Sequence, residues 1–224
     1  MWQPHSITPG SCRAFSRDGG QFAVGWNYGE IDLWGLESAN YIGVLQEPGN
    51  RSLSSSTTAS SLTFLDGGRL AAVFNQETLL AFSLPTNVST TLIPRQSGTA
   101  KEGSDIRGLA VSGDGRRLVS AGMRMGTQPG PFSGGTVCDV PMHGEVQVWD
   151  SASLKLVATL KGLATEKFST VALDNTGQRV AAVTTGVAYN PRMGRAMQYS
   201  AEYAPQGPRR VYLWDLSSPT STKK

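Results

Sequence analysis

Cysteine and histidine are scarce in this chain of 224 residues, which contains two of each. Cys12 and Cys138 form no repeated spacing, so the sequence predicts no disulfide framework. Two histidines are too few for a zinc site with three histidine ligands. The chain also has no Gly-x-Ser-x-Gly, His-Glu-x-x-His or Gly-Lys-Ser/Thr motif. We therefore expect no catalytic residues, no bound metal and no cofactor.

Long hydrophobic runs are absent as well. No stretch approaches the ~20 consecutive apolar residues that a membrane-spanning helix needs. The first six residues contain neither a basic region nor an apolar run, so no secretory signal is expected. The formal net charge is only +3, and the basic residues are scattered, whereas nucleic-acid-binding proteins usually concentrate them on one face. These absences predict a cytoplasmic protein with neither a membrane nor a nucleic-acid partner.

One strand pattern occurs four times along the chain. Residues 144–150, Gly-Glu-Val-Gln-Val-Trp-Asp, alternate with the period of two that places side chains on opposite faces of a strand. Each copy follows a turn sequence rich in Asp, Asn and Gly, and the aromatic residues of successive copies are 48, 67 and 65 residues apart. The pattern predicts four repeated units of short strands. The other strand copies span 30–34, 78–82 and 210–215, and the turns span 16–20, 65–68, 112–115 and 175–177.

These repeats resemble the WD-repeat family of β-propellers. The ending Trp-Asp is kept in two units, whereas Trp34-Gly35 and Phe82-Ser83 depart from it, and the family's Gly-His pair is missing apart from a lone His5. The resemblance implies an all-β fold, a β-propeller built of four-stranded antiparallel blades, with about four blades present. The segments that match the family are 14–19, 109–115, 149–150 and 214–215.

We expect a single domain over residues 1–224. The stretch after Leu216 contains Pro219 and no apolar alternation, so the fourth blade is predicted to lack its outermost strand there. Either the four blades close on themselves, or the ring is incomplete and is completed by another chain, another segment or a second copy. The blades are expected at about 11–45, 61–94, 106–160 and 168–216.

Two long loops, 123–143 and 186–209, are expected between the second and third strands of the last two blades, emerging on one face. The second is rich in Tyr, Met and Arg, which are enriched at interfaces, and Glu202 is its only acidic residue. The hypothesis is a non-catalytic scaffold that binds a protein partner, possibly acidic, through these loops. The candidate partner-binding residues are Tyr189, Arg192, Met193, Arg195, Tyr199, Tyr203 and Arg209.

Two alternatives stay open. The loops could simply cover the end of the propeller, with their Tyr and Met side chains forming a small satellite core. The first loop could instead hold a small ligand or Cu(I), because thioether, thiolate and imidazole groups suit this soft ion. The ligands in that case would be Met123, Met125, Cys138, Met142 and His143.

Overall fold

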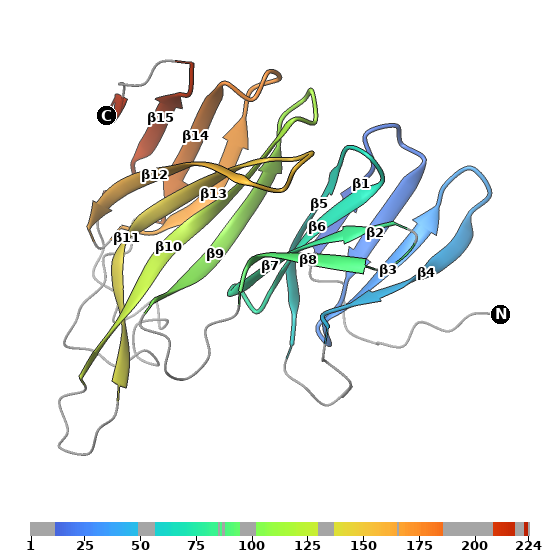
Figure 1. Ribbon diagram of the computed structural model, residues 1–224, viewed down its shortest axis with the longest axis horizontal. Coiled ribbons are helices and arrows are strands. Elements are labelled where there is room, and N and C mark those ends of the chain that lie inside the picture. Colours follow the sequence, from blue (N-terminus) through green and yellow to red (C-terminus); the bar gives the residue numbers. More distant parts are fainter. Residues whose placement is uncertain are drawn as a thin grey trace. The chain divides into compact units, whose positions relative to one another are not determined.

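The computed structural model of the chain consists of four antiparallel sheets of four strands each (Figure 1). In every sheet the strand order follows the chain, so consecutive strands pair with each other. The all-β prediction is therefore confirmed. The structure describes residues 12–48, 57–84, 86, 88–94, 102–129, 137–164, 166–185, 208–217 and 222–223.

The chain divides into two compact units. Unit 1 comprises residues 1–94 with 151–154, and it contains sheets A and B. Sheet A is formed by β1 (Cys12–Phe15), β2 (Gln21–Gly25), β3 (Glu30–Gly35) and β4 (Asn40–Gln46). Sheet B is formed by β5 (Ala59–Leu65), β6 (Arg69–Phe74), β7 (Thr78–Ser83) and β8 (Val88–Ile93).

Unit 2 comprises residues 95–150 and 155–224, and it contains sheets C and D. Sheet C is formed by β9 (Glu102–Val111), β10 (Arg117–Pro129), β11 (Val137–Asp150) and β12 (Leu156–Ala164). Sheet D is formed by β13 (Phe168–Leu173), β14 (Arg179–Thr184), β15 (Val211–Asp215) and β16 (Thr222–Lys223).

Glycine closes the predicted turn between the first two strands of every sheet. Gly19, Gly67 and Gly115 each have φ +74°, and Gly177 has φ +68°, in the left-handed region that other residues rarely adopt. In three of the turns an Asp side chain accepts hydrogen bonds from the backbone; Asp174 Oδ1 accepts from the amides of Gln178 and Arg179 at 2.8 and 3.0 Å. The four turns predicted from the sequence are thus confirmed.

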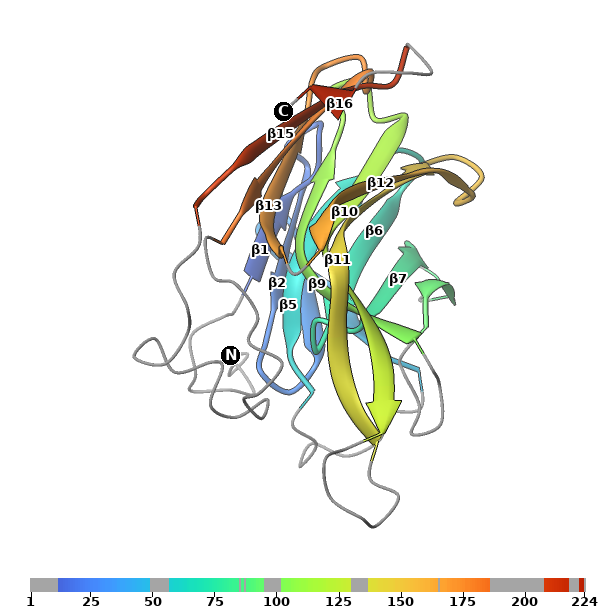
Figure 2. The same ribbon diagram turned by 90° about the vertical axis from the view of Figure 1, so that its left-hand side faces the viewer.

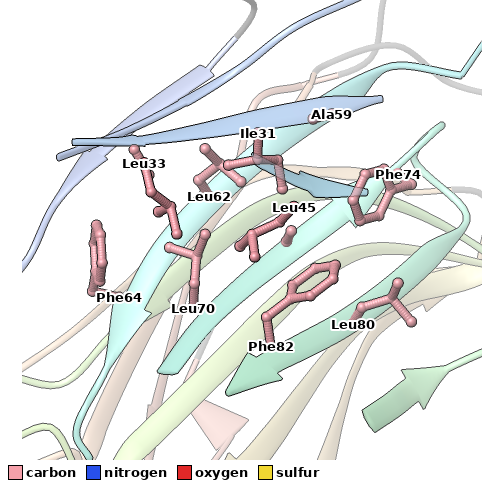
Figure 3. Close-up of a cluster of buried hydrophobic side chains, with 12 residues drawn as sticks. Ile31, Leu33, Leu45, Ala59, Leu62, Phe64, Leu70, Phe74, Leu80 and Phe82 are labelled. Carbon is pink, nitrogen blue, oxygen red and sulfur yellow. The ribbon is translucent and has the colours of Figure 1, made fainter. Parts of the chain in front are cut away.

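The core of unit 1 lies between its two sheets. Sheet A contributes mainly aliphatic side chains, whereas sheet B contributes several phenylalanines (Figure 3). The rings of Phe74 and Phe82 lie edge to face, with their centroids 6.2 Å apart. The fully enclosed members of this cluster include Ala23, Ile31, Leu70, Ala72, Phe74 and Phe82.

The core of unit 2 is built in the same way. Sheet C supplies small aliphatic residues, among them Val119 and Val148, and sheet D supplies three aromatic rings. Phe168 lies edge to face with Tyr212 and with Trp214, at centroid distances of 5.2 and 5.8 Å.

The ring of Phe168 occupies a slot between two glycines of sheet C. A Cβ atom added to Gly144 would lie 2.9 Å from Cε2 of Phe168, and one added to Gly162 would lie 2.9 Å from its Cζ. No side chain larger than hydrogen fits at either glycine while the ring stays in place. The slot thus joins β11 and β12 of one sheet to β13 of the other.

Two expectations about strands were wrong. Residues 123–143 are not a loop over most of their length, because β10 continues to Pro129 and β11 begins at Val137. The two strands stay paired from Met123↔Gly144 to Pro129↔Val137, as a long hairpin (Figure 2). Backbone pairing satisfies the amide and carbonyl groups of this Gly-rich segment, so its irregular composition does not prevent strand formation.

The outermost strand of sheet D was also missed. Thr222 and Lys223 pair with Trp214 and Leu213 as β16, although this part of the sequence shows no apolar alternation. An edge strand joins the sheet through backbone hydrogen bonds and does not need a buried face of its own.

Gly122 gives a direct test of this packing. A Cβ atom there would lie 1.9 Å from the carbonyl oxygen of Asp105, which belongs to the rigid neighbouring strand β9. We expect Gly122→Ala to lower the free energy of unfolding by about 2 kcal/mol or more, measured by urea denaturation. Gly43→Ala is the control, because nothing lies within 4 Å of a Cβ there. An equal loss in both variants would contradict the close approach.

Candidate functional site

Both long segments leave sheets C and D at the same end of unit 2, which we name the insertion end. The hairpin of β10 and β11 extends beyond Gly122 and Glu145, while β14 ends at Thr184 and β15 begins at Val211. The amide of Thr184 donates to the carbonyl of Arg210 at 3.0 Å, which holds the two ends of the second segment together. The charged residues whose side chains the structure describes at this end are Asp105, Arg107, Arg124, His143, Glu145, Lys161, Glu166, Lys167, Arg209 and Arg210. The backbone of two further acids, Glu102 in β9 and Asp139 in β11, also lies here.

A buried aspartate joins the two sheets at the insertion end. Asp105, in β9, accepts a hydrogen bond from Nζ of Lys167, the residue directly before β13. Its other oxygen accepts from Nε of Arg107 at 2.7 Å. The carboxylate is almost fully enclosed, so the ion pairs are screened by little water and leaving one charge unpaired would be costly. This three-membered cluster fixes the end of sheet D against sheet C.

A second cluster surrounds Glu166. Its carboxylate accepts from Nη1 of Arg210 and from the hydroxyl of Tyr212, and the amide of Leu163 donates to it at 3.3 Å. Burial of the phenol, followed by its hydrogen bond to Glu166, raises the pKa of Tyr212 above its ordinary value. Glu166 thereby orients both residues that lead into β15.

The third cluster lies on the hairpin. His143 Nε2 is 3.3 Å from Oε2 of Glu145, and the side-chain amide of Gln147 donates to the other oxygen at 2.8 Å. Lys161 lies opposite Glu145 in the register of β11 and β12. Each of the three carboxylates whose side chains are described at this end therefore has a cationic or amide partner, and the hydroxyl that bonds to one of them is the phenol of Tyr212. Such an arrangement positions strands and offers no general acid and base around a shared cavity.

Arg209 is the only predicted partner-binding residue that the structure describes. It is exposed, and it forms no ion pair with any described carboxylate. The other six predicted residues lie outside the described part of the chain: Tyr189, Arg192, Met193, Arg195, Tyr199 and Tyr203. Sequence reasoning missed Asp105, Glu166 and Lys167: Asp105 lies within β9, Glu166 and Lys167 directly precede β13, and no local pattern marks them.

The described residues do not gather the proposed Cu(I) ligands. Met123 and Met125 are buried and lie two positions apart on one face of β10. His143 pairs with Arg124, so it belongs to the opposite face, and Met142 is the exposed residue of a bulge. Among the described residues, no group of three or more His, Cys, Asp or Glu could hold a metal. Cys138 lies opposite Gln128 in the backbone register.

No family model matches the sequence, and no curated protein matches it. Solved structures do match. The Dos1 propeller is 14% identical with a TM-score of 0.62, and the match covers 97% of this chain and 48% of that one. The WD40 domain of Neurospora crassa Pan2 is 14% identical with a TM-score of 0.55, over 98% and 54% of the two chains. Hydrazine synthase of Kuenenia stuttgartiensis is 12% identical with a TM-score of 0.57, over 91% and 50%.

The fold is a β-propeller. Sheets A to D are its blades, and the resemblance predicted from the sequence is confirmed at the level of fold. The chain spans about half the length of these solved structures. At identities of 12–14%, these matches show the architecture of the blades, and they show no activity or partner. Within the described part of the chain, no helix could span a membrane.

The Asp105 cluster predicts that removing its carboxylate lowers the free energy of unfolding more than removing one of its cationic partners. Asp105→Ala leaves Lys167 and Arg107 without the carboxylate they share, at a cost of about 3 kcal/mol in the free energy of unfolding. Lys167→Met leaves Asp105 paired with Arg107 and should cost about 1 kcal/mol. Urea denaturation measures both. Equal losses would show that the aspartate is not the centre of the cluster.

Tyr212 predicts a pH-dependent effect. Its raised pKa means that the neutral phenol stabilises the fold fully below the ordinary value of 10.0 and that this contribution is lost as the pH rises through the folded-state pKa. We expect the absorbance titration of tyrosinate, taken as wild type minus Tyr212→Phe, to have its midpoint above pH 10.0. A midpoint at or below that value would refute the burial and the Glu166 hydrogen bond as its causes.

Proposed function

We propose that this chain is a non-catalytic scaffold that binds an acidic protein partner at the insertion end of unit 2. The observation that carries the proposal is the contrast between engaged carboxylates and an exposed guanidinium at this end. The carboxylates of Asp105, Glu145 and Glu166 are engaged within the structure, whereas the guanidinium of Arg209 is exposed and has no described carboxylate partner. Among the side chains described at this end, the charge available to a partner is therefore positive.

The sequence of the second insertion adds to this positive charge. Besides Arg209, residues 186–208 contain two further arginines and three tyrosines but a single acid, Glu202. Arg and Tyr are enriched at protein interfaces, since they combine a large contact area with polar ends. The acidic class of partner follows from charge complementarity, which governs the association rate and specificity of such contacts.

The lack of an acid–base or nucleophile constellation among the described residues supports the non-catalytic part of the proposal. The described carboxylates of the insertion end are engaged in structural clusters with cationic, amide and phenol partners. WD40-type neighbours are consistent with a scaffold role, although their names fix no particular partner for this chain.

A random peptide display library, selected on the full chain, tests the proposal. We expect the selected peptides to be enriched in Asp and Glu and their affinity to fall as salt is added. Arg209→Glu, and separately replacement of residues 188–206 by a short Gly-Ser turn, should each weaken binding by about tenfold or more. Fluorescence anisotropy of a labelled selected peptide measures the change.

Arg116→Glu is the matched control, because it makes the same charge change on an exposed residue at the opposite end of sheet C. It should leave the affinity unchanged. Selection of peptides without acidic enrichment, or an equal loss in Arg116→Glu and Arg209→Glu, would overturn the proposal.

A further inference from the structure

Each blade carries two neighbouring rows of side chains that run across its strands, one on either face. The cross-strand register defines the first row in sheet A as Phe15, Phe22, Trp34 and Tyr41. We call it the aromatic row, since every blade has Trp or Phe at its third-strand position. The corresponding positions are Phe64, Leu70 and Phe82 in sheet B, Val111, Leu118 and Trp149 in sheet C, and Leu173, Val180 and Trp214 in sheet D.

The second row lies one residue away along each strand and therefore on the other face. We call it the aliphatic row, because it consists mainly of Ala, Val and Leu. Its members are Ala14, Ala23 and Leu33 in sheet A, Thr63, Ala71 and Ala81 in sheet B, Ala110, Val119 and Val148 in sheet C, and Ala172, Ala181 and Leu213 in sheet D.

Within each unit the two rows meet in one defined order. In unit 1 the aliphatic row of sheet A, with Ala23 and Leu33, lies in one core cluster with Phe64 and Phe82 of the aromatic row of sheet B. In unit 2 the aliphatic row of sheet C lies in one cluster with Trp214 of sheet D. The earlier blade thus presents aliphatic residues and the later blade presents aromatic residues, at both interfaces.

Two rows of the chain lack such a cover. In the aromatic row, Phe15 of sheet A is 62% exposed, whereas the equivalent Phe64 of sheet B is 7% exposed. In the aliphatic row, Leu213 of sheet D is 57% exposed, whereas the equivalent Leu33 and Val148 are 3% and 0% exposed. The first blade therefore has an open face of aromatic type, and the last blade has one of aliphatic type.

We propose that the open face of sheet D docks on the open face of sheet A in a second copy of this chain. The contact repeats the order of rows found inside both units, with Leu213 and Ala181 of one copy facing Phe15 and Phe22 of its partner. The surface of sheet D is suited to receive a ring: it has a shallow depression of about 500 Å³ whose lining includes Ala172, Ala181 and Leu213. An aromatic side chain that fills such a depression is a typical anchor of an interface.

The second copy is favoured as the occupant because one chain carries both halves of the contact. Two copies then make the same head-to-tail contact twice, and the assembly closes without leaving either face open. Twice four blades give eight, which lies within the ~4–8 blades of known propellers.

Light scattering across a concentration series tests the proposal on the full chain. We expect the wild type to have the mass of two chains, and Leu213→Glu and Phe15→Glu each to have the mass of one, because each places a charge at both contacts of the closed pair. Val157→Glu is the control: Val157 is similarly exposed but lies in β12 of another sheet, and its variant should remain a dimer. Circular dichroism verifies that each variant is folded.

Mixing the two variants tests the head-to-tail order. In a pair of Leu213→Glu with Phe15→Glu, one contact carries both glutamates and the other is entirely wild type. We expect the equimolar mixture to regain the mass of two chains, with a dissociation constant well above that of the wild type. A wild type that stays monomeric at every concentration, or a mixture that stays monomeric while the wild type is dimeric, would overturn the proposal.

Discussion

The constraint on which this structure depends is that every blade is apolar on both faces. An antiparallel sheet can leave one polar face in water, but these sheets carry Trp or Phe on one side and Ala, Val or Leu on the other. Each blade therefore needs a neighbour on either side. Burial of these apolar faces causes each blade to stack on the next. For the same reason, a blade at an open end of the stack exposes an apolar face.

The charged clusters of unit 2 add directed local contacts to this apolar packing. Apolar stacking is non-directional, whereas the Asp105 and Glu166 clusters make directed bonds that connect sheet C with the start of sheet D and with β15. They lie at the insertion end, with Asp105 opposite Met123 in the sheet register and Glu166 bonded to Arg210 just before β15. The second insertion, for which we propose a binding role, is thereby attached to a rigid base, which is how binding loops commonly achieve a defined geometry.

The sequence allowed the repeats, turns and third strands to be predicted because these are local signals. Gly19 and Gly177, for example, stand in short Asp- or Asn-containing turns between alternating strands. Asp105 and Lys167 are 62 residues apart and share no local pattern, so only the stacking of two blades brings them together. β16 and the outer half of the β10–β11 hairpin were missed for another reason. They form by backbone pairing, which the periodicity of side chains does not reveal.

The glycine slot around Phe168 has a consequence for how two blades align. Flat apolar faces can slide over each other by several ångströms with little change in buried area, so burial alone leaves the offset between sheets C and D poorly defined. The ring fits only where Gly144 and Gly162 lie beneath it, and any translation would drive it against a neighbouring side chain or backbone atom. Phe168 thus prevents the two sheets from sliding over each other, and it fixes which residues of the two blades are neighbours.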